Sequence, residues 1–288
     1  MKCKLLACIM VVGLSAVMLT SCSKKEFQTA TAISTVSREG GSGTRSAFSD
    51  LFQLIEKKDN GHKTDLTTEE AIIVNKTGVM MVNVAGDQYA IGYISLGSLN
   101  DSVKALEIDG VMPSVDNIKD GSYTIARPFY IAAKEGLSTQ GKDFVNFILS
   151  EEGQKIVEES HYIPFVEDPK PYKPQDVKGE LVIAGSSSVT PVMEKLKEAY
   201  EELNKDVTLE VQQNDSTTGL QSCITGICDI AMSSRELTDN ELKELTPVKI
   251  ALDGIAIIVN KGNPIMGLTK DQVREIFTGE VTTWQETN

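Results

Sequence analysis

Residues 37–45 read Ser37-Arg38-Glu39-Gly40-Gly41-Ser42-Gly43-Thr44-Arg45 and lie between a β-type apolar run, 32–36, and a helical run, 48–55. A turn of this composition gathers backbone N–H groups, hydroxyls and the positive end of a helix dipole around one point, which is what an oxyanion needs. Arg38 adds a forked cation. Ordinary glycine and serine turns look the same in isolation, so the rest of the chain has to decide between the two interpretations.

Three further loops share this character. They are Gly185-Ser186-Ser187-Ser188-Val189-Thr190-Pro191, Asn214-Asp215-Ser216-Thr217-Thr218-Gly219 and Asp229-Ile230-Ala231-Met232-Ser233-Ser234-Arg235. Each combines a β-type run with hydroxyl side chains at its end, and the first two also open a helical run. Four independent helix caps would be a coincidence. Because open α/β sheets bind ligands at the carboxyl ends of their strands, the four loops favour one shared anion site.

Strand-like and helix-like segments alternate along the chain. A helical run at 77–84 precedes a buried strand at 89–95, and a strand at 127–132 precedes a helical run at 144–157. This alternation is typical of α/β proteins with parallel sheets. Residues 166–179 contain three prolines among lysines and aspartates and are the best candidate for a linker. The length suits one large or two medium α/β domains.

The N-terminus has the pattern of an export signal. A basic start is followed by an uncharged apolar run, 5–18, and by Leu19-Thr20-Ser21-Cys22. The run is too short to span a membrane comfortably, so a secretory signal over 1–21 is favoured over a transmembrane helix. The ending resembles a bacterial lipobox, which predicts that Cys22 becomes the lipidated, palmitate-carrying anchor, with 22–31 as a tether and the rest of the chain outside the cytoplasm.

Charge and composition narrow the classes of partner. The formal net charge is −13, and loss of residues 1–21 would remove two lysines and no acidic residue. Nucleic acid is therefore not expected as a partner. An acidic protein can still bind an anion, because dipoles and one local cation inside a closed cleft act where screening is weak.

Cysteines and histidines give no sign of metal or catalytic chemistry. Cys223 and Cys228 flank a helix-to-strand passage, where they form either a bridge or, as the simpler interpretation, two small buried residues. With His62 and His161 they lack the spacing of a metal site. A nucleophilic Ser187 or Ser42 would need a neighbouring base. We therefore predict neither an enzyme, nor a metal, nor a cofactor.

Several motifs together resemble the phosphate-binding protein of bacterial phosphate ABC importers. They are GSSSVTPVMEKLKEAY (185–200), DSTTGL (215–220), DIAMSSREL (229–237), ALDGIAIIVNKGNPI (251–265), REIFTGEVTTW (274–284) and VSREGGSGTRSAF (36–48). The resemblance implies an α/β, two-lobed type II periplasmic-binding-protein fold with the ligand cleft between the lobes. It also implies phosphate delivery to a membrane permease and its ATPase subunit, and we expect a monomer.

The order of these motifs departs from the family, in which the GSSSV segment comes first and the REGGSGTR segment follows soon after TTW. The chain is therefore predicted to be circularly permuted, which folding tolerates when termini are close and the new break lies in a loop. One lobe would comprise 32–126 plus 252–288, and the other 127–251, including the linker 166–179. The alternative is a piece of a tandem duplication or a misassembled gene.

Carried over by motif, the resemblance predicts the phosphate-binding residues. Arg38 is the charged clamp, and the donors are Ser42, Gly43, Thr44, Ser187, Ser188, Val189 and Ser216. Where known members place an aspartate that accepts a hydrogen bond from protonated phosphate, this chain has Ser234, followed by Arg235.

The missing aspartate bears on selectivity, because such an acceptor repels fully ionised sulfate. Glu39 or Asp215 are candidates to replace it, and Arg235 is a candidate second cation. Binding of another tetrahedral oxyanion, such as sulfate or molybdate, and a phosphate-sensing or scavenging lipoprotein are the alternative functions.

Overall fold

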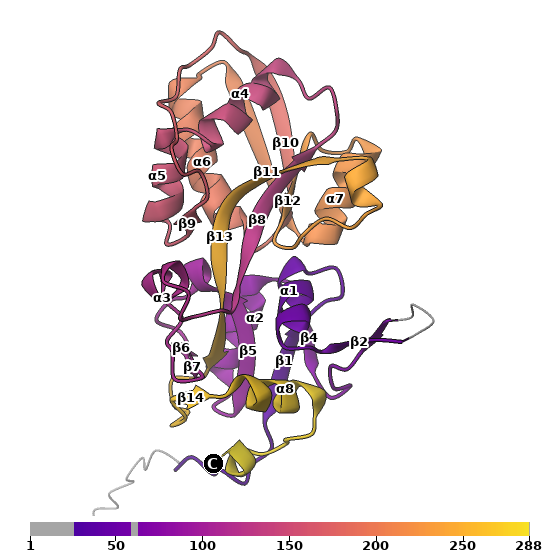
Figure 1. The fold of residues 1–288 in the computed structure, drawn as a ribbon, viewed down its shortest axis with the longest axis vertical. Helices are drawn as coiled ribbons and strands as arrows, with labels where there is room; N and C mark the ends of the chain where they lie inside the picture. The colour runs from indigo at the N-terminus through magenta and orange to yellow at the C-terminus, as the bar shows by residue number, and fades with distance from the viewer. Residues whose placement is uncertain (1–25, 59–62, 288) are drawn as a thin grey trace, which may run out of the picture.

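Two long antiparallel strands connect the two halves of the molecule (Figure 1). The computed structural model describes residues 26–58 and 63–287. The two strands are β8 (Ala126–Ala133) and β13 (Thr246–Val259), and Arg127 stands opposite Asp253 in their ladder. A strand rises about 3.4 Å per residue, so β13 is long enough to reach from one half into the other. Both halves are therefore built on one shared pair of strands.

β8 and β13 belong to a ten-stranded sheet. Its other strands are β1 (Ser34–Arg38), β4 (Ile72–Val74), β5 (Ala90–Ser95), β6 (Lys104–Ala105), β9 (Ile163–Pro164), β10 (Gly179–Ser186), β11 (Val207–Asn214) and β12 (Ile230–Ser233). The order along the sheet is β11-β10-β12-β8-β13-β5-β1-β4, and β6 and β9 also pair with β13. The two connecting strands therefore separate one group of strands, β10 to β12, from the other, β1, β4 and β5.

The helices cover both groups of strands. They are α1 (Gly43–Leu51), α2 (Thr77–Gly86), α3 (Val115–Lys119), α4 (Thr139–Ile148), α5 (Glu151–Glu159), α6 (Thr190–Leu203), α7 (Ser216–Thr225) and α8 (Lys270–Thr278). Short 3₁₀ helices are η1 (Leu96–Ser98), η2 (Glu241–Lys243) and η3 (Trp284–Thr287). Two small sheets pair β2 (Ile55–Lys57) with β3 (Lys63–Asp65), and β7 (Glu107–Ile108) with β14 (Gly267–Leu268). None of the helices within the described ranges is apolar over a length sufficient to cross a membrane.

The prediction of parallel sheets holds for part of the main sheet and is wrong at its centre. β1 pairs in parallel with β4 and β5, and β10 pairs in parallel with β11 and β12. β8 and β13 instead pair antiparallel with each other, and they meet β12 and β5 in antiparallel register. Alternation of strands and helices predicts parallel neighbours within each half, but it carries no information on strands that pass from one half to the other.

Two large hydrophobic cores lie on either side of the connecting strands. The first takes its buried side chains from 36–125 and 255–284, together with Ile163. The second takes them from 129–251. A smaller cluster between α7 and β12 also belongs to the second half. The chain therefore enters the first core twice, before β8 and again at the end of β13.

Segments from both ends of the described chain lie side by side. Ala32 forms an antiparallel bridge with Thr283, and the backbone N–H of Ile33 donates to the carbonyl of Thr282 at 2.8 Å. Trp284 is fully buried, and its indole N–H donates to the carbonyl of Tyr89 at 3.1 Å. Residues before β1 and after α8 thus share one small patch of structure at the base of the molecule (Figure 1).

A buried ion pair fixes the crossing of β8 and β13. The Arg127 guanidinium donates to Asp253 at 3.1 Å, and Asp253 also accepts from the Ser95 hydroxyl at 2.9 Å. Burial raises the pKa of Asp253 to about 6 despite the neighbouring cation. Burial likewise lowers the pKa of Arg127. Desolvation of this pair therefore outweighs the mutual attraction of the two charges.

The first prediction concerns the contact between the two end segments. Replacement of the buried Trp284 by alanine should lower the free energy of unfolding by about 3–5 kcal/mol, because it removes a large side chain from the first core. Val82→Ala on α2 is the control, since Val82 is 71% exposed and should change stability by less than about 0.5 kcal/mol. Urea unfolding measures both. Equal effects of the two substitutions would contradict the packing described.

The second prediction follows from the raised pKa of Asp253. Because the unfolded carboxyl titrates near 3.8, between about pH 4 and pH 6 the folded protein holds a proton on Asp253 that the unfolded chain has lost. The contribution of Asp253 to stability should therefore fall as the pH rises from about 4 to about 6, and stay constant above that range. In Asp253→Asn this contribution is absent, so the variant should lose more stability than the wild type on going from pH 6 to pH 4. Urea unfolding across this range checks the slope, and identical slopes would contradict it.

Candidate functional site

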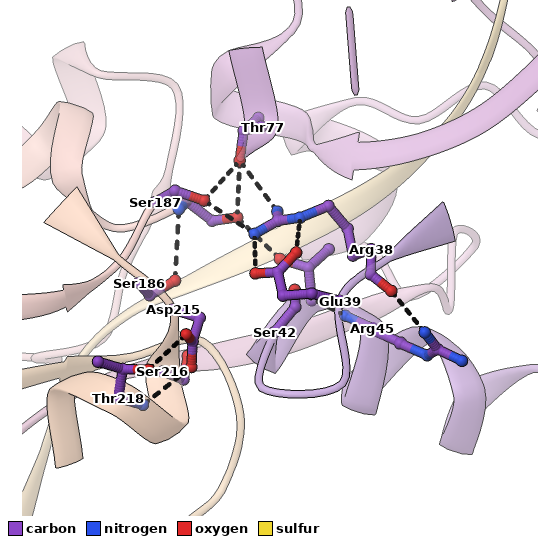
Figure 2. A network of polar contacts seen from close by, with 12 residues as sticks. Arg38, Glu39, Ser42, Arg45, Thr77, Ser186, Ser187, Asp215, Ser216 and Thr218 are labelled. Carbon is purple, nitrogen blue, oxygen red and sulfur yellow. Dashed lines mark hydrogen bonds and ion pairs between the residues drawn. The ribbon is translucent and has the colours of Figure 1, made fainter. Parts of the chain in front are cut away.

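Four helices begin at one place between the two halves. α1 starts after β1 and α2 starts after β4, while α6 and α7 start after β10 and β11. The residues at these four starts are Gly43, Thr77, Thr190 and Ser216. Their neighbours contact one another across the gap between the halves (Figure 2). The N-terminal ends of four helices, with their backbone N–H groups and the positive ends of their dipoles, therefore surround one small volume.

The turn at 38–44 is held rigidly by its own half. The backbone N–H of Arg38 donates to the hydroxyl of Tyr93 at 3.0 Å, and the Arg45 guanidinium donates to the Arg38 carbonyl at 2.6 Å. Ser42 caps α1 by accepting from the N–H of Arg45 at 3.2 Å. Ser42 is therefore placed as a helix cap facing the same region, and its backbone fixes where the following Gly43 and Thr44 lie.

Two glycines of this turn are required because the other half approaches closely. A Cβ on Gly41 would lie 2.4 Å from Oδ1 of Asp215, and one on Gly43 would lie 2.4 Å from Oγ of Ser216 and 2.7 Å from Oγ of Ser234. The N–H of Thr217 also donates to the Gly41 carbonyl at 3.2 Å. The glycine-rich sequence of the turn thus makes room for the helix start of α7.

The second half supplies a connected group of serine hydroxyls. The Ser186 hydroxyl donates to Ser234 Oγ at 2.8 Å, and Ser216 Oγ accepts from the backbone N–H of Ser234 at 3.1 Å. Ser186 Oγ also accepts from the N–H of Ser188 at 3.3 Å. Val189 is buried beside them at the start of α6.

Direct hydrogen bonds join the two halves. Arg38 Nη2 donates to Ser187 Oγ at 3.2 Å, and the hydroxyls of Thr44 and Ser188 are 2.8 Å apart. Thr77 Oγ1 lies 3.2 Å from Ser187 Oγ. The halves are closed over this group, since each of these five residues is no more than 4% exposed. We call the group the hydroxyl cluster, and its members are Arg38, Thr44, Thr77, Ser186, Ser187, Ser188, Ser216 and Ser234.

Glu39 neutralises the cation of the cluster. Its carboxylate accepts from Arg38 Nε at 2.9 Å and from Nη2 at 2.8 Å, a bidentate ion pair (Figure 2). The Glu39 side chain is 22% exposed and that of Arg38 is 3% exposed, so the carboxylate lies nearer to solvent than the guanidinium. The remaining Nη1 of Arg38 has Thr77 Oγ1 at 3.4 Å, a long contact that leaves this edge of the guanidinium weakly occupied.

The structure brings together all the predicted site residues except one. Arg235 instead places both arms of its guanidinium on Glu241, each at 2.8 Å, and donates to Thr217 Oγ1 at 3.0 Å. Burial works to raise the pKa of Glu241, but hydrogen bonds from Arg235 and Thr238 bring it below its usual range. Arg235 therefore stabilises the loop after β12, and we remove it from the candidate site.

Two members of the cluster were not predicted from sequence. Thr77 begins α2 shortly after the strand β4, so Lys76-Thr77-Gly78 is a fifth strand-end turn with a hydroxyl side chain. This turn contains fewer serines and glycines than the other four, and its sequence therefore gave a weaker signal. Ser186, the last residue of β10, donates to Ser234, whereas the motif resemblance indicates only the two serines that follow it.

The remaining residues considered in the sequence are the possible metal ligands, the two histidines and the lipobox. Among residues 26–58 and 63–287, no group of three or more His, Cys, Asp or Glu side chains is placed to hold a metal ion. His62 and the lipobox, including Cys22, lie outside the described residues. His161 is an exposed turn residue with positive φ directly after α5.

Comparison with known proteins places this chain in a family. The family model described as a PBP superfamily domain matches residues 20–152 and 170–288. Phosphate-binding protein PstS 2 of Streptococcus agalactiae is 48% identical over 289 residues, covering 99% of this chain and 98% of that protein. The crystal structure of a phosphate-binding protein of a phosphate ABC transporter from Streptococcus pneumoniae is 43% identical, with a TM-score of 0.71. It covers 90% of this chain and all of that chain.

A third relative matches over a shorter stretch. Phosphate-binding protein PstS of Staphylococcus saprophyticus is 39% identical over 119 residues, which is 38% of this chain and 37% of that protein. The full-length matches confirm the α/β binding-protein fold predicted from the motifs. With its four helix starts gathered between two halves, this chain belongs to the PBP superfamily and, within it, to the family of phosphate-binding proteins of phosphate ABC transporters.

Proposed function

We propose that this protein binds inorganic phosphate in the hydroxyl cluster and delivers it to the permease and ATPase subunits of an ABC importer. One observation carries the proposal: four helix N-termini, one buried arginine and seven hydroxyl side chains converge between two lobes. Such a site offers many donors and a single formal positive charge, which suits a small, strongly hydrogen-bonding anion. The S. agalactiae and S. pneumoniae relatives, named as phosphate-binding proteins, support the choice of anion.

Binding would exchange contacts between the lobes for contacts to phosphate. Arg38 with Ser187 and Thr44 with Ser188 now bond directly across the gap. A phosphate bound between the two lobes would accept hydrogen bonds from the same donors through its four oxygens. Each lobe would then bond to the phosphate instead of directly to the other lobe. Opening and closing about β8 and β13 is the hinge motion that such a site requires.

The selectivity of the site is proposed to rest on Glu39. Phosphate near neutral pH carries a proton and sulfate does not, so an ionised acceptor discriminates between them. Ser234 stands where the family has an aspartate, and a serine hydroxyl can donate as well as accept. Asp215 caps α7, and its oxygens accept from the N–H and the hydroxyl of Thr218 at 2.8 and 2.6 Å. Glu39, at the guanidinium of Arg38, is the better placed carboxylate.

We also propose that the chain is circularly permuted. Residues 32–33 pair with 282–283. A short loop joining these segments, together with a break in the linker 166–179, would restore the family order, and this linker would be the joint between the old ends. The lobes are then 32–126 with 252–288, and 127–251. The collinear match to the S. agalactiae protein supports a working arrangement rather than a gene fragment. The match over 38% of the chain to the S. saprophyticus protein is what a relative with the halves in the opposite order would give.

The site of action follows from the family. Binding proteins of ABC importers act outside the cytoplasm, and the lipobox at 19–22 supports a lipid anchor on Cys22, with 22–31 as the tether. We propose that the mature protein is a monomer held at the outer side of the cell membrane by this anchor.

The first test is isothermal titration of the mature chain with phosphate and with sulfate. Saturable one-to-one binding of phosphate, with much weaker binding of sulfate, is expected. Preferred binding of sulfate or molybdate would assign the site to another oxyanion. Release of phosphate from an ester at catalytic protein concentration would replace the binding function by an enzymatic one.

The third prediction identifies the clamp. Arg38→Ala should weaken phosphate binding by about 2–5 kcal/mol, because it removes a desolvated charged donor, while Arg38→Lys should lose less since it keeps the charge. Arg235→Gln is the matched control and should bind phosphate within about a factor of two of the wild type, because that guanidinium serves Glu241. Titration calorimetry with circular dichroism as a folding check measures all three. Equal losses for the Arg38 and Arg235 variants would place the site elsewhere.

The fourth prediction concerns selectivity. Glu39→Gln should raise sulfate affinity more than phosphate affinity, and so reduce their ratio by about tenfold, the effect of about 1.4 kcal/mol. Asp215→Asn keeps a good helix cap and should leave the ratio unchanged. Competition titrations at pH 7 measure the ratio. A parallel rise in both affinities would show that Glu39 acts only as a counter-ion of Arg38.

A further inference from the structure

Two cysteines of the second lobe meet at the C-terminal end of α7. The helix ends at Gly226, which has a left-handed backbone and donates to the carbonyl of Cys223 at 3.1 Å. The N–H of Ile227 donates to the carbonyl of Ser222 at 2.8 Å. These two bonds reverse the chain within three residues and bring Cys228 back alongside the last turn of the helix.

The two sulfur atoms lie in each other's immediate surroundings. Cys228 Sγ contacts the carbonyl of Gly219, one turn before Cys223, at 3.8 Å. Cys223 Sγ contacts the carbonyl of Asp229, the residue after Cys228, at 3.4 Å. Each thiol is the largest influence on the pKa of the other, as expected for adjacent side chains. Both are buried in the apolar cluster between α7 and β12.

We propose that Cys223 and Cys228 form an oxidisable dithiol, which closes to an intramolecular disulfide in the exported protein. Disulfides form and persist in oxidising surroundings outside the cytoplasm, which is where proteins of this family act. The inference does not depend on which anion the cluster binds. No third Cys, His, Asp or Glu within the described ranges joins the pair to make a metal site.

The reaction is thiol–disulfide exchange with a carrier disulfide, such as oxidised glutathione or the active-site disulfide of an oxidoreductase. The thiolate of one cysteine attacks a sulfur of the carrier, forms a mixed disulfide and releases one carrier thiol. The second cysteine then attacks the protein-bound sulfur, closes the Cys223–Cys228 bond and releases the second carrier thiol. The protein gives up two protons and two electrons, and the carrier disulfide is reduced.

Cys223 is the better first nucleophile. The neighbouring Cys228 side chain brings the pKa of the Cys223 thiol below its usual value although burial opposes this, and the Cys223 side chain together with burial raises the pKa of Cys228. Thiolates rather than thiols react. Access requires local opening, and the turn Thr225-Gly226-Ile227 is exposed, with Ile227 at 68%. Both cysteines belong to the small cluster and not to either of the two large cores, so opening of this turn would expose the sulfurs while the large cores stay closed.

The bond would stabilise the second lobe without crossing the cleft. It ties the C-terminal end of α7 to the start of β12, while the hydroxyl cluster uses the opposite ends of these two elements, Ser216 and Ser234. Oxidation should therefore raise the unfolding midpoint. It should change phosphate affinity by less than about twofold, because the bond lies within one lobe and involves no residue of the hydroxyl cluster.

The test refolds the soluble chain from Ser23 onward, in which Cys223 and Cys228 are the only cysteines, from denaturant in a buffer of reduced and oxidised glutathione. Acid quenching, alkylation in denaturant and peptide mass spectrometry then count the thiols. We expect the loss of both thiols, a peptide linked between residues 223 and 228, and a higher urea midpoint that dithiothreitol reverses. Phosphate titration of the same samples separates this result from any failure of the anion site.

Two variants keep the test decisive. Cys228→Ser should retain a single thiol that is captured as a glutathione adduct during refolding, and Cys223→Ser should give the same adduct on Cys228 in lower yield. Recovery of two alkylated thiols in the wild type would overturn the proposal. Recovery of glutathione adducts or intermolecular dimers in place of the internal bond would overturn it as well.

Discussion

A guanidinium buried between two lobes has to be matched by polar partners on every side, and this requirement on Arg38 organises the molecule. Its partners are Glu39 beside it in the chain, Thr77 at the start of α2 and Ser187 from the other lobe. The other lobe can approach this closely because positions 41 and 43 carry no side chain, which leaves room for Asp215, Ser216 and Ser234. The close approach of the lobes therefore supplies the polar partner that the buried guanidinium of Arg38 needs from the second lobe.

The same arrangement explains why so many helices start at one place. Each helix start contributes unpaired N–H groups and the positive end of a dipole. In the closed structure serine and threonine hydroxyls occupy the space between them, and they can donate to an anion or to one another. A site built from neutral donors with one compensated cation is compatible with a protein of net charge −13. The described acidic residues other than Asp143 and Asp253 are at least partly exposed to solvent, while the interaction takes place in a closed interior.

Local sequence rules predicted the parts of the site that lie on strand-to-helix turns. Arg38, Thr44, Ser187, Ser188, Ser216 and Ser234 sit in turns whose glycine and serine content is visible in the chain. Partners chosen across space could not be predicted in this way. The pairing of Arg235 with Glu241, the role of Thr77 and the antiparallel crossing of β8 and β13 all depend on which segments the fold brings together. The α/β class was predictable from the alternation of strands and helices and the two-lobed fold from the family resemblance, while the orientation of the central strands was not.

A crystal structure of the mature protein grown with phosphate would show directly whether phosphate binds in the hydroxyl cluster. We expect tetrahedral density between the lobes within hydrogen-bond distance of Arg38, Thr44 and Ser188, with the Arg38–Glu39 pair retained. An empty cluster, with phosphate bound at another surface of a folded protein, would contradict it.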